Sequence, residues 1–73
     1  MPKFLVVNVS EGQIHLEIPP HVDAMHLHFT QITLPHSQAV DLYPLTGSIA
    51  VCKRLSRLHG LEMQNQIRIE IED

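Results

Sequence analysis

The chain lacks the features that staple small extracellular domains or anchor membrane proteins. Its 73 residues include a single cysteine, Cys52, so no disulfide can form within the chain. No apolar run approaches the ~18 residues of a membrane span, and the apolar stretch at the start is too short and too soon interrupted for a signal peptide. We therefore expect one domain, residues 1–73, located in the cytoplasm and making no membrane contact.

Positive charge is also scarce. Five Lys and Arg stand against eight Asp and Glu, which gives a net charge of −3 with neutral histidines. This balance offers no general attraction for nucleic acid, so any DNA contact needs a local basic patch. The only clustered cations are Lys53, Arg54 and Arg57, which are our candidates for phosphate contacts. The alternative is that they form a solvated helix face.

Signals for catalysis are missing. The serines lie in no Gly-X-Ser-X-Gly elbow, and the three glycines are too far apart to form a phosphate-binding loop. The carboxylates show no paired spacing. Cys52 falls on the apolar face of a predicted helix, where a thiol is usually an inert core residue. We therefore expect that the protein is not an enzyme and binds no cofactor.

Apolar residues are plentiful, at 44% of the chain. A domain of this length buries only about 60% of the surface of its unfolded chain. Small domains that lack disulfides often gain stability from a metal or from a second subunit. The composition therefore favours a homodimer.

Alternating hydrophobic residues predict strands in the first half of the chain. Residues 3–9 are rich in β-branched side chains, and residues 13–18 place Ile14, Leu16 and Ile18 on one face. Gly12 suits a turn between them, so we predict an N-terminal β-hairpin. Residues 24–34 predict a third strand, with a bulge near Thr30 and Gln31 where the phase of the alternation slips.

The second half of the chain adds a helix and a last strand. A short extended piece is predicted at residues 39–43, followed by one short helix near residues 48–59 and a C-terminal strand at residues 66–72. Gly60 suits the end of the helix. The fold class predicted from these elements is α+β, a small sheet-dominated domain of about four to five strands.

The six histidines suggest a metal site or a titrating surface. His26 and His28 share one face of the predicted third strand, and His15 and Glu17 share the outward face of the strand before it. If these strands are neighbours, the four side chains could converge as a metal-binding set. The alternative is a solvated sheet face whose imidazoles become charged together near about pH 6–6.5.

Glycine and aliphatic residues follow one continuous pattern near the C-terminus: Gly47-x-Ile49-x-Val51, Leu55, Gly60-Leu61 and Ile67-x-Ile69-x-Ile71. From Gly47 to Asp73 the chain thereby resembles the AbrB/MazE swapped-hairpin family. The resemblance implies an intertwined homodimer that binds DNA as a transcription regulator or antitoxin. Ser48 and Ser56 stand where the family has basic residues, so no DNA-contact residue of the family transfers to this chain.

Three functions follow from these patterns. The first is a non-enzymatic protein-interaction module, such as an accessory or inhibitor protein. Its partner would meet an exposed sheet edge or a patch around Phe4, Val6 and Tyr43. The second is the DNA-binding homodimer implied by the family resemblance. The third is a metal-binding protein that uses the histidines.

Overall fold

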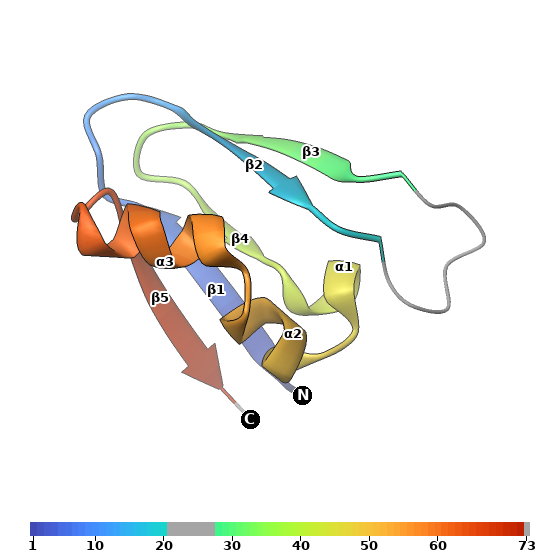
Figure 1. The fold of residues 1–73 in the computed structure, drawn as a ribbon. Coiled ribbons are helices and arrows are strands. Elements are labelled where there is room, and N and C mark those ends of the chain that lie inside the picture. Colours follow the sequence, from blue (N-terminus) through green and yellow to red (C-terminus); the bar gives the residue numbers. More distant parts are fainter. Residues whose placement is uncertain (21–27, 73) are drawn as a thin grey trace.

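The computed structural model describes residues 1–20 and 28–72. These residues form five strands in two antiparallel sheets and three short helices (Figure 1). The elements in chain order are β1 (Lys3–Asn8), β2 (Ile14–Ile18), β3 (Thr30–Leu34), β4 (Ala39–Asp41), α1 (Tyr43–Thr46), α2 (Ile49–Lys53), α3 (Ser56–Met63) and β5 (Ile67–Glu72). The predicted α+β, sheet-dominated class is confirmed. None of the helices in these two ranges is long and apolar enough to cross a membrane.

The larger sheet has the strand order β4-β1-β5. β1 is its central strand and pairs with β5 over six residues, from Lys3 opposite Glu72 to Asn8 opposite Ile67. Every second residue of β1 is buried, because successive side chains of a strand point to opposite faces of the sheet. The first and last strands of the chain thus lie side by side, and β5 is left at an edge of the sheet.

β2 and β3 form the smaller sheet, and they correct the predicted hairpin. β2 pairs with β3, from Ile14 opposite Leu34 to Ile18 opposite Thr30, and belongs to a different sheet from β1. The prediction that residues 3–9 pair with residues 13–18 is therefore wrong. The physical reason is that β4 and β5 occupy both hydrogen-bonding sides of β1.

β3 is shorter and more regular than predicted. Its register with β2 is continuous across Thr30 and Gln31, so the predicted bulge is wrong. The alternation changes phase there because the strand begins at Thr30, and His28 and Phe29 precede it. The predicted strand positions up to residue 27 lie outside the described residues.

The predicted helix at residues 48–59 is in fact two helices. Ser48 caps α2, since its Oγ accepts a hydrogen bond from Val51 N at 3.4 Å. Leu55 then has an extended backbone (φ −73°, ψ 100°) that breaks the helix before α3. Gly60 lies inside α3 rather than at its end. α1 was not predicted, and Pro44 occupies its first turn, where a missing N–H costs little.

The helices cover the face of the larger sheet from which Phe4 and Val6 project. α1 and α2 pack on β1, and α3 packs on β5. The buried apolar residues form one cluster: Phe4, Val6, Ile14, Leu16, Ile18, Leu34, Leu42, Cys52, Leu58 and Ile67. The prediction of an exposed patch is consequently wrong for Phe4 and Val6, which are 1% and 0% exposed. Tyr43 is half-buried against the same cluster.

Candidate functional site

The outer edge of β5 carries backbone groups that no other described strand pairs. Hydrogen bonds at the other side of the sheet establish which groups these are: Asn8 N donates to Gln38 O at 2.9 Å, and Leu42 N donates to Phe4 O at 2.8 Å. The backbone N–H and C=O groups of the even-numbered β1 residues therefore point toward β4, and those of the odd-numbered residues point toward β5. The bond from Val9 N to Gln66 O at 3.0 Å confirms the direction of the odd-numbered groups.

The same alternation runs through β5. Arg68 pairs with Val7 and Glu70 with Leu5, so the backbone groups of these two β5 residues point toward β1. The N–H and C=O groups of Ile67, Ile69 and Ile71 point the opposite way, toward the free edge. Three residues thus present both a donor and an acceptor to a further strand.

The two faces of β5 differ in chemistry. Exposure of the isoleucines rises along the strand, from 3% at Ile67 through a half-buried Ile69 to 42% at Ile71. Arg68, Glu70 and Glu72 project from the other face and are exposed. Arg68 Nη2 and Glu70 Oε2 form an ion pair at 3.3 Å, so these two charges compensate each other.

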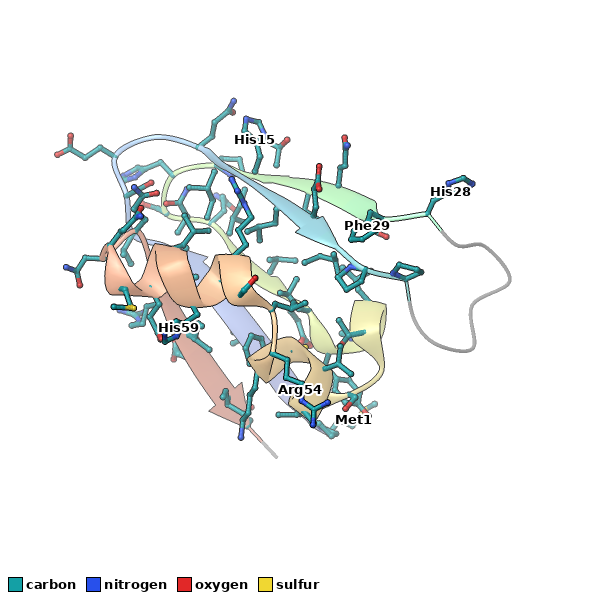
Figure 2. All side chains as sticks on the ribbon, viewed as in Figure 1. Met1, His15, His28, Phe29, Arg54 and His59 are labelled. Carbon is teal, nitrogen blue, oxygen red and sulfur yellow. The ribbon has the colours of Figure 1, made fainter. Side chains whose placement is uncertain are left out.

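A groove of about 290 Å³ runs beside the edge, between β5 and the two helices α2 and α3. Its apolar lining includes Leu55, Ile69 and Ile71. Polar side chains of Lys53, His59 and Glu62 line it from the helices, and Figure 2 shows His59 on α3. The arrangement suits a polypeptide side chain: apolar contact from the strand, and polar partners from the helices.

The other described strand edges offer less. β4 has only three residues. The outer edge of β2 is partly covered, because Arg57 Nε donates to His15 O at 3.2 Å. β3 presents the exposed polar side chains of Gln31 and Thr33. Among these strands, β5 alone combines a long free edge with an apolar groove.

The three predicted phosphate-contact residues are exposed but diverge. Lys53 lines the groove on the β5 side, whereas Arg57 reaches toward β2. Arg54 is the C-cap of α2, and Figure 2 shows it beside that helix. The break at Leu55 separates them, so they do not form the single basic helix face that the sequence predicted.

The described residues of the predicted metal site do not come together. His15 and Glu17 are exposed on β2, and His15 lies opposite Thr33, with its Nδ1 3.2 Å from Thr33 Oγ1. His28 precedes β3, at the far end of the strand pair (Figure 2). The prediction that His15 and His28 converge is therefore wrong. His26 lies outside the described residues. Within residues 1–20 and 28–72, no three His, Cys, Asp or Glu side chains are placed to share a metal ion.

Cys52 is a core residue. Its side chain is 1% exposed, and its Sγ lies 3.0 Å from Thr46 Oγ1. Burial raises the pKa of the Cys52 thiol, which disfavours the nucleophilic thiolate. The structure therefore gives this thiol no feature of a reactive cysteine.

The sequence predicts an exposed sheet edge but does not indicate that β5 forms it. The signal that was present is the alternation of isoleucine with charge from Ile67 to Glu72. That alternation shows two faces and says nothing of strand order. No family model matches the sequence, and no curated protein or solved structure matches it.

Proposed function

We propose that this chain is a non-enzymatic protein-interaction module that binds an extended segment of another polypeptide along the outer edge of β5. The observation that carries the proposal is the unpaired edge beside an apolar groove. In recognition by strand addition, main-chain hydrogen bonds supply affinity, and pockets for alternate side chains supply specificity. The outward backbone groups of Ile67, Ile69 and Ile71 offer the main-chain hydrogen bonds, and the groove offers a pocket for a side chain.

The chemistry of β5 supports this use of the edge. Proteins often protect a long free edge with a proline, a bulge or an inward-pointing charged residue. β5 is regular over six residues and contains no proline. Its charges project from the face of the sheet that points away from the helices. They leave the row of isoleucine donors and acceptors open to a partner strand.

The DNA-binding alternative has less support. A duplex attracts proteins through cations that reach several phosphates together. Here the net charge is −3, Arg57 is engaged with β2, and Lys53 is turned toward the β5 groove. An accessory or inhibitor protein needs no such patch, because its binding element is a strand edge.

The test compares two proline variants at opposite edges of one sheet. Ile71→Pro removes a donor that points out from β5, and Ala39→Pro removes one that points out from β4, so neither breaks a bond to β1. Each tagged variant captures proteins from cells of the source organism, with quantification by mass spectrometry. Circular dichroism confirms that both variants are folded.

We expect Ile71→Pro to lose at least about 90% of the specific capture, because one of three outward donors is missing and the backbone is locked. Ala39→Pro should retain the capture. Equal capture by the wild type and by folded Ile71→Pro contradicts the proposal.

A further inference from the structure

We infer that the strand bound by the β5 edge is β5 of a second copy of this chain, antiparallel to the first, with the two-fold axis at Ile69. This inference rests on the proposed function and names its partner. The result is a continuous sheet with the strand order β4-β1-β5-β5-β1-β4. It joins the two long free edges to each other and leaves only the short β4 strands outside.

The backbone allows this register without any rearrangement. Antiparallel strands exchange hydrogen bonds between directly opposed residues whose N–H and C=O groups face one another. In β5 these residues are Ile67, Ile69 and Ile71. An axis at Ile69 sets this residue opposite its own copy and sets Ile67 opposite Ile71. All the outward isoleucine groups are then used on both strands.

The charges select the same register. With the axis at Ile69, Arg68 lies opposite Glu70 of the second copy, and Glu70 lies opposite Arg68 of the second copy. These are the non-hydrogen-bonded positions, where opposed side chains are closest. Opposite charges at such positions stabilise a sheet, and like charges destabilise it. Because both residues are at least half exposed, their pairing leaves no charge buried.

Other two-fold registers are less favourable. An axis at Arg68 or at Glu70 sets that residue against its own copy, with like charges opposed. An axis at Ile71 opposes Glu70 to Glu72. An axis at Ile67 opposes Arg68 to Gln66 and forms no ion pair. Only the axis at Ile69 opposes Arg68 to a carboxylate without opposing any like charges.

The same register also buries exposed apolar surface of β5. A two-fold axis perpendicular to the sheet keeps the helices of both copies on one side. Ile71, which is 42% exposed in the single chain, then lies beside Ile67 of the second copy. The groove next to it faces the corresponding groove of the second copy across the axis. The most exposed isoleucine of β5 is thereby removed from water.

Charge reversal provides a test that depends on the register. Arg68→Glu opposes two glutamates at both charged positions of the dimer, and Glu70→Arg opposes two arginines. Each variant alone has only like-charge pairs across the axis. An equimolar mixture of the two forms complementary pairs at both positions. The ion pair within one chain is lost equally in both variants, so it cannot explain a rescue by mixing.

The measurement is sedimentation equilibrium on the full chain, together with hydrogen exchange. We expect a wild-type dimer in which the amides of Ile67, Ile69 and Ile71 are protected. Each single variant should dimerise at least about tenfold more weakly, and the mixture should return to within about threefold of wild type. Glu17→Arg, an exposed reversal on β2, serves as a control and should leave the dimer constant unchanged.

Two results overturn the inference. One is a wild-type chain that stays monomeric at several hundred micromolar, and the other is a mixture that dimerises no better than either variant. The outcome for the proposed function is separate. If the chain is monomeric but Ile71→Pro loses a different captured protein, the proposed function stands and the second-copy partner is wrong. If Ile71→Pro loses neither the dimer nor a captured protein, the proposed function and the second-copy partner are both wrong.

Discussion

Asn8 is expected to be among the residues least tolerant of change, because its buried amide joins the two sheets. The side chain is 1% exposed. Its Nδ2 donates to Gly12 O at 2.8 Å and to Leu34 O at 2.9 Å. Its Oδ1 accepts from Ser10 N at 2.9 Å and from Ser10 Oγ at 2.6 Å. One amide therefore ties the end of β1 to the following turn and to the end of β3.

Asn8→Asp perturbs this network with almost no change in shape. The Nδ2 donor becomes an oxygen, so two hydrogen bonds become contacts between an oxygen and the carbonyls of Gly12 and Leu34. Two lost hydrogen bonds are worth ~1–3 kcal/mol together, and an unsatisfied buried polar group adds ~1–3 kcal/mol. We expect a loss of about 3 kcal/mol or more, against roughly 4–11 kcal/mol for the total stability of a chain of this size.

The assay is urea unfolding followed by circular dichroism, at one protein concentration, with a thermal melt as a second measurement. A loss of 3 kcal/mol corresponds to a fall in Tm of about 12–24 °C for a domain of this size. Ser10→Ala, which keeps the Ser10 N–H bond, is the control and should cost only about 1 kcal/mol.

The pH dependence distinguishes this mechanism from a loss of packing. Burial among carbonyls raises the folded-state pKa of the new carboxyl above its unfolded value of about 3.9. The deficit relative to wild type is therefore full above the folded pKa and shrinks as the pH falls toward the unfolded pKa. If Asn8→Asp lies within about 1 kcal/mol of wild type at pH 7, the amide does not join the sheets as argued.

Because the Cys52 thiol is buried with a raised pKa, Ellman's reagent should react slowly with the folded chain and at once in urea. The free energy of unfolding should also fall as the pH rises past about 8.5, where the unfolded thiol ionises, and Cys52→Ala should lessen that fall. For DNA, we expect no duplex binding in a gel-shift assay at low salt. Salt-sensitive binding that disappears on Arg54→Glu with Arg57→Glu would instead favour the DNA-binding function.

The sequence predicts the local elements well, because local alternation determines them. Ile14, Leu16 and Ile18 are all buried, as their spacing of two residues indicates. The C-terminal strand spans Ile67–Glu72, within the predicted residues 66–72, with its isoleucines toward the helices and its charges on the other face. These features depend on the pleat of one strand and on one buried face, and both are visible in a short window of residues.

Strand pairing and the position of the helix break are not visible in such a window. Gly12 and the two flanking strands predict a hairpin, yet Asn8 bonds to the end of β3 and both sides of β1 are occupied by later strands. The continuous apolar run of β1 also leaves open which of its faces is buried. Phe4 and Val6 face the helices, and these helices include α1, which was not predicted.

The candidate site depends on the one property that alternation cannot supply, which is strand order. In the middle of a sheet, Ile67 to Glu72 would be an ordinary half-buried strand, and the opposite signs of Arg68 and Glu70 would serve whichever neighbours they met. At an edge, the backbone N–H and C=O groups of the three isoleucines point outward. A second copy can pair with them in only a few registers. Arg68 and Glu70 flank Ile69 symmetrically and carry opposite signs. Pairing about Ile69 therefore makes the edge self-complementary, and pairing about Arg68 or Glu70 does not. Reversing one sign should abolish that self-complementarity, and mixing two opposite reversals should restore it, which no role confined to a single chain predicts.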